Sequence, residues 1–330
     1  MGLPGKPSPG TRSQREREFS RQFEFMKSTA IEVQAPAVPA SAPSLGARAR
    51  IAAYVELTKP RITSLIMLTA AAGFGLGAEG GVNYLLLTHA MVGIGLLASG
   101  LGAVNQYMER DLDLLMRRTA DRPLPTQRLQ PIEALLFGIT LIASAELYLA
   151  LFTNGLTTVL GFSVIAGYLF AYTPLKTRTT FSTFVGAFPG AMPPVLGWTA
   201  ARGRLDVTAL VLFAILFLWQ FPHFLAIAWM YREDYGRAGI CMLPVVEPDG
   251  RVTGQQIIAY TVMLVPVSLL PTVLGISGKI YFVSALILGL LFLASGVRAA
   301  LSKSNQHARQ LLMASVFYLP LLFGVMVLNR

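Results

Sequence analysis

Apolar runs of about 17 to 24 residues recur along this chain, each near the length that a helix needs to cross about 30 Å of hydrocarbon. We count about nine of them, centred on 62–78, 85–104, 132–152, 156–172, 181–200, 206–230, 256–275, 280–297 and 308–328. The runs are continuous rather than alternating, and an open sheet in lipid would leave backbone groups unpaired, so strands are excluded. With 54% apolar and only 13% charged residues, the chain is predicted to be all-α, an integral membrane bundle of about nine transmembrane helices.

Lysine and arginine accumulate on alternate connections between these runs, and such an excess marks the cytoplasmic side of a membrane protein. With nine spans and the N-terminus inside, the inner segments hold Lys59, Arg61, Arg110, Arg117, Arg118, Arg122, Arg128, Lys176, Arg178, Arg232, Arg237, Arg251, Arg298, Lys303 and Arg309. The outer segments hold only Arg202, Arg204, Lys279 and Arg330. The net charge of +10 therefore reflects topology and in part function, and no nucleic-acid partner is expected.

Residues 1–50 differ from the rest, being rich in Pro, Ser, Ala and Gly, with alternating Arg and Glu in "RSQREREFSRQFEF". No apolar stretch there is long enough for a signal peptide. We predict a disordered cytoplasmic N-terminal tail over 1–50 and a polytopic membrane domain over 51–330. Glu16, Glu18 and Glu24 disfavour a mitochondrial presequence. A bacterial inner membrane is the expected location, with the mitochondrial inner membrane as the alternative.

The block "NQYMERDLDLLMRRTADRPLP", which begins at Asn105, follows directly on the second apolar run. Asn105, Glu109 and Asp113 are spaced at i, i+4 and i+8, which stacks them along one face of a helix. Oxygen ligands so arranged suit Mg²⁺, which takes one or two carboxylates and completes its octahedron with waters and substrate phosphate oxygens. Arg118 and Arg122 follow, and their forked donors can clamp a diphosphate. A solvated loop with positive-inside arginines is the plain alternative, but topology does not require the helix-spaced triplet.

A second acidic stretch, "MYREDYGRAG", follows the sixth apolar run on the same predicted side of the membrane. Its Glu233 and Asp234 can hold a second Mg²⁺ or form the other side of the first cluster. Between the two stretches in sequence, the loop "YTPLKTRTT" supplies Lys176 and Arg178, which can reach the oxygens of a leaving group. Two acidic helix ends that face one cavity would grip a diphosphate from both sides.

These motifs resemble those of the UbiA superfamily of membrane prenyltransferases. That family has an Asn-x-x-x-Asp-x-x-x-Asp motif in the second helix and a second aspartate motif after the sixth, in a nine-helix bundle. Three further stretches resemble the haem branch of the superfamily: "ELTKPRITSL", "YTPLKTRTTFSTFVGAFPGAMPPVLGW" and "WQFPHFLAIAWMYREDYGRAGICMLPVV". The resemblance covers roughly residues 52–330 and is most specific in the last of these stretches.

Three positions depart from the family pattern. Glu109 replaces the usual Asp, which keeps the carboxylate and extends its reach by one methylene. Ser182 stands where Asn is common. The first acid of the second motif falls at Met230, so Asp234, with Glu233, carries that half. The haem branch generally shows this reduced motif, which disfavours a 4-hydroxybenzoate prenyltransferase.

The resemblance implies an enzyme that joins the farnesyl group of farnesyl diphosphate to a vinyl group of haem B with addition of water. The product is haem O for terminal oxidases, so haem A synthase or terminal oxidase assembly factors are the implied protein partners. The implied catalytic residues are Asn105, Glu109, Asp113, Lys176 and Asp234. The implied Mg²⁺ ligands are Asn105, Glu109, Asp113, Glu233 and Asp234, and the implied diphosphate clamps are Arg118, Arg122 and Arg178.

His223, in "WQFPHF", is the candidate for contact with haem, either as an axial ligand or as a hydrogen-bond partner that orients the macrocycle. A histidine in a membrane helix can instead be a packed polar residue paired with a neighbour. Trp219 fits a substrate wall or an aromatic belt. An aromatic chamber that excludes water and stabilises a cation is predicted from Tyr107, Phe181, Phe184, Phe188, Phe221 and Phe224. Glu146 lies mid-span, and we assign it no role.

Three other functions compete with this one. A transporter also uses Pro and Gly breaks and charged helix ends, but it predicts internal repeats and acids near mid-membrane. A second enzyme reading keeps the superfamily and changes the acceptor to an aromatic acid or another tetrapyrrole. A third reading makes the protein an oxidase assembly factor without catalysis, which requires that Asn105, Glu109 and Asp113 be replaceable by Ala without loss.

Overall fold

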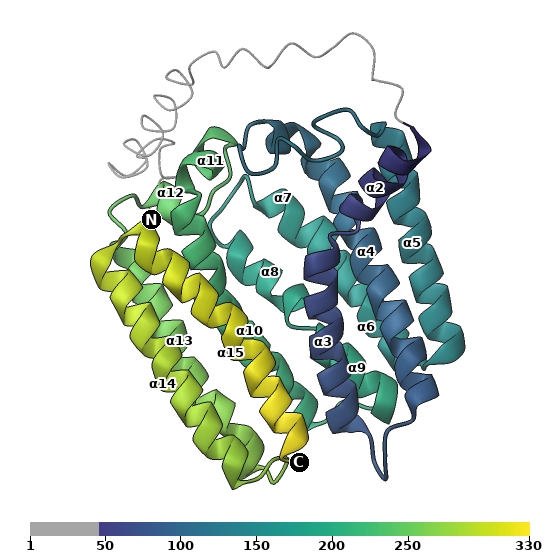
Figure 1. Ribbon diagram of the computed structural model, residues 1–330, viewed down its shortest axis with the longest axis vertical. Helices are drawn as coiled ribbons and strands as arrows, with labels where there is room; N and C mark the ends of the chain where they lie inside the picture. Colours follow the sequence, from purple (N-terminus) through teal and green to yellow (C-terminus); the bar gives the residue numbers. More distant parts are fainter. Residues whose placement is uncertain (1–45) are drawn as a thin grey trace, which may run out of the picture. The chain divides into compact units, whose positions relative to one another are not determined.

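The computed structural model describes residues 46–330, and every regular element in this part is a helix (Figure 1). Residues 1–45 of the tail predicted over 1–50 lie outside the described residues. Helix α2 begins at Ala47. In chain order the elements are α2 (Ala47–Leu57), α3 (Pro60–Gly77), α4 (Tyr84–Leu114), α5 (Pro131–Phe152), α6 (Gly155–Ile165), η1 (Ala166–Tyr172), α7 (Thr173–Leu175), α8 (Ser182–Gly190), α9 (Pro193–Arg202), α10 (Val207–Met230), α11 (Arg232–Arg237), α12 (Leu243–Val246), α13 (Arg251–Val273), α14 (Lys279–Ser302) and α15 (Asn305–Leu328).

Among residues 46–330, seven helical segments are long and apolar enough to cross a membrane. They are Tyr84–Leu114, Pro131–Phe152, Gly155–Leu175, Val207–Met230, Arg251–Val273, Lys279–Ser302 and Asn305–Leu328. Two further passes complete the predicted set: α3, which is 18 residues long, and the pair α8 and α9. The all-α bundle of about nine transmembrane helices is therefore confirmed, and the chain is a multi-pass membrane protein.

The fifth predicted span consists of two helices. Helix α8 ends at Gly190 and α9 starts at Pro193, because Pro193 and Pro194 cannot donate the backbone hydrogen bonds that would continue α8. The break is stabilised from outside: Gln220 of α10 donates to the backbone oxygen of Ala187 at 3.0 Å. A neighbouring side chain thus supplies a hydrogen bond beside an interrupted helix in the membrane interior.

Helices α3 and α9 pack with their backbones in contact. A Cβ atom added at Gly73 would overlap the carbonyl oxygen of Pro194, and one added at Gly197 would overlap the carbonyl oxygen of Ala70. Small residues allow this approach in membranes, where close van der Waals packing replaces the hydrophobic drive for association. Gly197 therefore serves helix packing.

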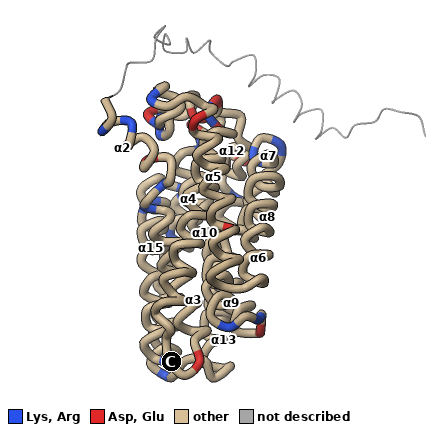
Figure 2. The backbone as a smooth tube through the Cα atoms, turned by 90° about the vertical axis from the view of Figure 1, so that its right-hand side faces the viewer, with Lys and Arg blue, Asp and Glu red and all other residues tan. Residues whose placement is uncertain are grey.

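Charged residues gather at the ends of the bundle, most densely at the end where α2, α7 and α12 lie (Figure 2). We call this the charged end; α4 and α10 reach it at Leu114 and Met230. The opposite end carries fewer charges, among them the ion pair between Arg202 and Glu79. This distribution follows the predicted alternation of basic and less basic connections.

The α3–α9 contact predicts that Gly73→Ala destabilises the protein by about 1–3 kcal/mol, the usual cost of overpacking a filled core. Gly75→Ala on the same helix is the matched control, because its Cβ would meet only a methyl group of Val327 at 3.9 Å. Thermal unfolding in detergent micelles measures both variants. Equal melting temperatures for the two would contradict the close packing.

Candidate active site

Three polar side chains occupy one face of the last turns of α4. Asn105, Glu109 and Asp113 are only 2%, 7% and 0% exposed. They share a face because four residues make slightly more than one helical turn. The helix carries them because it continues beyond the apolar run to Leu114. Buried carboxylates need partners, so their contacts define the site.

Each of the three receives a hydrogen bond from a cation elsewhere in the chain. Lys59 Nζ donates to Asn105 Oδ1 at 2.8 Å, and Lys176 donates to Glu109 in a salt bridge. Arg122 Nη1 lies 2.8 and 2.7 Å from the two carboxylate oxygens of Asp113. We call these six residues the polar cluster. Three cations face two carboxylates in it, so the cluster can accept a further anion.

The two lysines differ in their electrostatics. Lys59 lies between α2 and α3, where desolvation, together with the nearby guanidinium of Arg122, lowers its pKa from 10.5 to about 7. Desolvation acts the same way on Lys176, just after α7, but the Tyr172 ring and the Glu109 carboxylate outweigh it and raise the pKa of Lys176. Lys176 is therefore a permanent cation, whereas the charge of Lys59 depends on what lies beside it.

Lys176 is positioned by an unusual helical segment. Residues Ala166–Tyr172 form a π-helix, which widens the helix by one residue per turn and occurs often at functional sites. The ring of Tyr172 lies under Lys176 Nζ at 4.5 Å from the ring centroid. On its other side this ring packs against Gly186 of α8, where a Cβ would overlap it. The glycine thus makes room for the tyrosine that holds Lys176.

The second acidic stretch, which contains Asp234, connects two loops. Asp234 is buried and accepts from the backbone N–H of Arg118 at 3.3 Å and from the side chain of Arg237. Arg118 also donates to the hydroxyl of Tyr235 at 3.1 Å, and Arg237 donates to the backbone oxygen of Leu115. The loop after α4 and the segment around α11 therefore meet at the charged end.

A third loop joins this junction. The backbone N–H of Cys241 donates to the backbone oxygen of Lys176 at 2.7 Å. Met116, Ala238 and Ile240 form a small buried apolar cluster beneath these contacts. The loops that carry Lys176, Arg118 and Asp234 are thereby held against one another. Desolvation there raises the pKa of the Tyr235 phenol, which stays neutral.

His223 and Trp219 lie deeper, one turn apart on α10. Their rings stack with centroids 4.6 Å apart. Both are tied to Ser315 of α15: His223 Nδ1 lies 2.7 Å from the Ser315 hydroxyl oxygen, and Trp219 Nε1 donates to the Ser315 backbone oxygen at 2.9 Å. One buried residue therefore fixes the orientation of both rings.

Known proteins resemble this chain in sequence. The sequence pattern of the UbiA prenyltransferase family matches residues 66–321. A protohaem IX farnesyltransferase of Solibacter usitatus is 54% identical over 286 residues, which cover 84% of this chain and 98% of that protein. The chain belongs to the UbiA prenyltransferase family. A second member, a protohaem IX farnesyltransferase of Koribacter versatilis, is 48% identical and covers 88% of this chain and 97% of its own length.

Solved UbiA-type structures share the fold. A digeranylgeranylglyceryl phosphate synthase superposes with a TM-score of 0.71 at 16% identity, covering 85% of this chain and 98% of its own. A UbiA homologue from Archaeoglobus fulgidus, solved with DMAPP and Mg²⁺, superposes with a TM-score of 0.58 at 16% identity. It covers 83% of this chain and 98% of that one. That homologue thus binds Mg²⁺ together with DMAPP.

The polar cluster fits that use of a metal in a UbiA-family protein. Within residues 46–330 no group of three or more His, Cys, Asp or Glu side chains could hold a metal ion by itself. Mg²⁺ at a phosphate site does not need such a group, because one or two carboxylates and the substrate oxygens suffice. Glu109, Asp113 and the amide oxygen of Asn105 supply this donor set. The Asn105 amide nitrogen is buried without a partner, so it is available to a ligand.

Three predicted residues lie away from this arrangement. Tyr107 packs against the cluster of Ala53 and Leu57 near α2, because two residues along α4 turn the side chain about 200° from the Asn105 face. Its place in a substrate chamber stays a prediction. Glu233 and Arg178 are exposed, and neither forms an ion pair with any residue in 46–330. Only Asp234 of the second acidic pair points inward, because its neighbour falls on the outer side of α11.

The predicted aromatic chamber is only partly enclosed. Phe184, Phe217 and Phe221 form a run of ring contacts between α8 and α10. Phe181 and Phe188 continue this run but are 56% and 47% exposed.

Glu146 lies in the middle of its span. It is buried against Gly161 of α6, and both its carboxylate oxygens lack a partner among the described residues.

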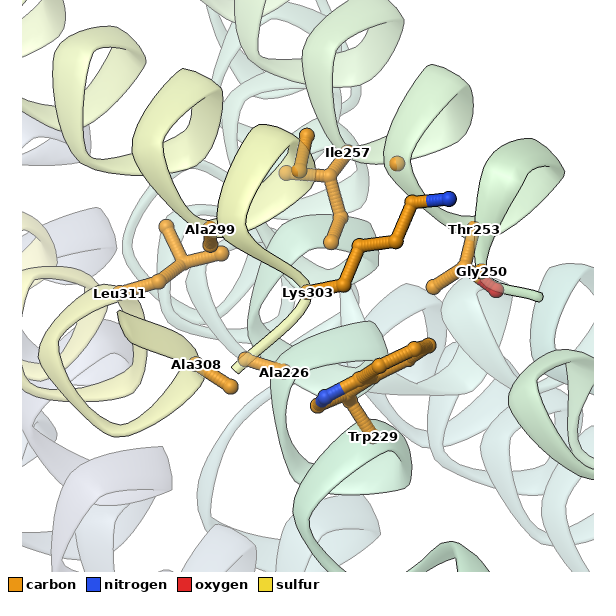
Figure 3. Close-up of a pocket in the computed structure, with 11 residues that line it drawn as sticks. Ala226, Trp229, Gly250, Thr253, Ile257, Ala299, Lys303, Ala308 and Leu311 are labelled. Atoms are coloured by element: carbon orange, nitrogen blue, oxygen red, sulfur yellow. The ribbon is translucent and has the colours of Figure 1, made fainter. Parts of the chain in front are cut away.

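A small cavity lies apart from the polar cluster, between α10, α13, α14 and α15 (Figure 3). Trp229 and Lys303 border it, together with small residues such as Gly250 and Ala299. Its volume of about 10 Å³ is the space of about one water molecule. This cavity is too small for a substrate of a UbiA prenyltransferase.

Sequence reasoning missed Lys59 as a site residue. The signal was present in "ELTKPRITSL", where this lysine precedes the proline that starts α3. Its backbone is left-handed, with φ of 50°, and this turns the side chain back toward α4. No local pattern indicates that it meets Asn105, which is far away in sequence.

The contact predicts that Lys59→Met weakens binding of Mg²⁺-pyrophosphate by about tenfold or more, because a hydrogen bond to a charged group contributes about 1.5–3 kcal/mol. Arg61→Met is the control, since Arg61 is close in sequence but exposed. Isothermal titration calorimetry on the purified protein measures both. Wild-type affinity in Lys59→Met would remove Lys59 from the site.

Proposed function

We propose that this chain is a protohaem IX farnesyltransferase. It transfers the farnesyl group of farnesyl diphosphate to a vinyl group of haem B, with addition of water, and forms haem O. The observation that carries this is the 54% identity, over nearly the whole length of the relative, with a protein of that name. The polar cluster supports it, because it offers buried carboxylates and three cations at one end of a membrane bundle.

Departure of the diphosphate is the first chemical requirement. Mg²⁺, when bound at Asn105, Glu109 and Asp113, supplies charge neutralisation of the diphosphate oxygens. Lys59, Lys176 and Arg122 are already within reach of the same three side chains. Positive groups held in place before the reaction stabilise charge as it develops on the leaving group, at little reorganisation cost. The cluster therefore favours cleavage of the allylic C–O bond.

The second acidic stretch acts on the loops. Asp234 holds the backbone of Arg118 and the side chain of Arg237, so it fixes the loop that contains Arg122. In this role Asp234 holds in place the loop whose Arg122 clamps the diphosphate. Arg118 stacks over Tyr231 at 5.1 Å from the ring centroid, where its guanidinium borders the same end of the bundle.

The allylic cation has to meet the vinyl carbon before bulk water does. Tyr172, beside Lys176, provides a π face at the charged end, and the ring contacts among Phe184, Phe217 and Phe221 continue this apolar surface deeper between α8 and α10. Such faces stabilise a cation, and the closed loops limit entry of water. The terminal vinyl carbon forms the new C–C bond as the C–O bond to diphosphate breaks, which leaves positive charge on the vinyl carbon next to the macrocycle. One water molecule adds there and loses a proton, and this gives the hydroxyl of the product.

The proposed location is a bacterial inner membrane, with the charged end in the cytoplasm according to the positive-inside rule. Haem A synthase or oxidase assembly factors are proposed to receive the product. The relatives named above are bacterial, which supports the bacterial over the mitochondrial membrane.

Extraction of haems from membranes that contain the protein, after incubation with haem B, farnesyl diphosphate and Mg²⁺, tests the function. The expected product is a new haem whose mass has increased by one farnesyl group and one hydroxyl group. EDTA should abolish its formation. Asp113→Asn should reduce its formation at least 100-fold, because a buried carboxylate of the polar cluster is lost. Asp111→Asn is the matched control, since the Asp111 side chain is 80% exposed and should remain fully active.

Unmodified haem B with the folded wild-type protein would contradict the proposal. The same membranes would then be tested with 4-hydroxybenzoate, so that prenylation of that acid would reassign the acceptor within the UbiA family. Full activity of Asp113→Asn with haem B would leave the acceptor intact and overturn the role of the polar cluster.

A further inference from the structure

The hydrogen bonds around His223 define which of its nitrogens carries the proton. The Ser315 hydroxyl lies 2.6 Å from the backbone oxygen of Leu312, which can only accept, so the serine proton points there. The Ser315 oxygen is then left to accept from His223 Nδ1 at 2.7 Å. Nδ1 therefore carries the proton of the neutral ring, and Nε2 carries the lone pair.

The second nitrogen is accessible. No residue within 46–330 forms a hydrogen bond with Nε2, and Nε2 is not among the buried polar atoms that lack a partner. The ring cannot turn freely to hide it, because Trp219 stacks on it and is itself fixed by the Ser315 backbone oxygen. A histidine that served packing alone would be satisfied by Ser315 and would not need an accessible Nε2 lone pair.

The location suits a large planar acceptor. Helices α10 and α15 lie side by side (Figure 1), and His223 is seven residues before the end of α10 at Met230. Seven residues of helix span about 10 Å, so a macrocycle held at His223 brings its edge toward the charged end. A vinyl group on that edge can approach the allylic carbon of a diphosphate held at the polar cluster.

We propose that His223 Nε2 ligates the iron of the haem substrate and that Ser315 is the positioning residue that makes this possible. The inference rests on the proposed function, because it takes haem B as the acceptor. A ligating histidine usually donates its other N–H to an oxygen acceptor, which fixes the tautomer and makes the ligand more basic. The Leu312–Ser315–His223 chain provides that acceptor, with a hydroxyl whose own proton is committed elsewhere.

Haem B binding to the purified full-length protein, without farnesyl diphosphate, tests the ligation. In the reduced complex, resonance Raman spectroscopy should show an iron–histidine stretching band. His223→Gly should lose the band and bind haem at least tenfold more weakly, and added imidazole should restore the band. His223→Gln, which keeps the size and polarity of the side chain, should lack it as well.

The same iron–histidine Raman band tests the positioning role of Ser315. Ser315→Ala should shift it to lower frequency and weaken haem binding about 10–100-fold, the usual effect of removing an acceptor behind a ligand. Ser315→Thr retains the hydroxyl and should restore both. The control is Ser268→Ala on α13, where another buried serine donates to a backbone oxygen, that of Leu264, without touching His223.

Each failure has its own meaning. Retention of the band in folded His223→Gly and His223→Gln would overturn ligation by His223. An unshifted band and unchanged affinity in Ser315→Ala would overturn the role of Ser315. The haem O assay on the wild type is run in parallel: product formation without a His223-dependent band removes only this inference, whereas a His223-dependent band without product removes the proposed function.

Discussion

Buried charges in a membrane protein have to be paired, and the charged end depends on how this chain pairs them. Asn105, Glu109 and Asp113 are enclosed at the end of α4, and each is held by one cation from a different segment. Lys59 comes from the corner before α3, Arg122 from the loop after α4, and Lys176 from the segment after α7. The pairing therefore brings three separate segments of the chain together. It forms a polar site at the charged end of the bundle rather than in the membrane interior.

The fold could be predicted well from sequence because its main signals are local. Continuous apolar runs predict the spans, and the i, i+4, i+8 spacing of Asn105, Glu109 and Asp113 predicts a shared helix face. The π-helix before Lys176 and the full break between α8 and α9 could not be predicted, since both depend on packing. Proline predicts a disturbance of a helix, but whether the helix bends or ends depends on neighbours such as Gln220.

The site was harder to predict where distant segments meet. Lys59 contacts Asn105 only because of a left-handed residue at the corner before α3. Tyr107 was predicted from its residue type, whereas its position on the helix places it against Ala53 and Leu57. Glu233 and Asp234 are adjacent in sequence, yet only one is buried, since neighbouring residues on a helix point in different directions. Residue type predicted the chemistry, and backbone geometry selected which residues take part.

The contact between α3 and α9 bears on how molecules reach the site. Where Gly73 and Gly197 bring two backbones together, no side chain remains that could swing aside. The contact between α3 and α9 is consequently closed to any molecule that is dissolved in the lipid, whatever its shape. A farnesyl chain or a macrocycle that diffuses in from the bilayer must pass between other helices. The direction of substrate entry is thus restricted by two glycines that touch no substrate.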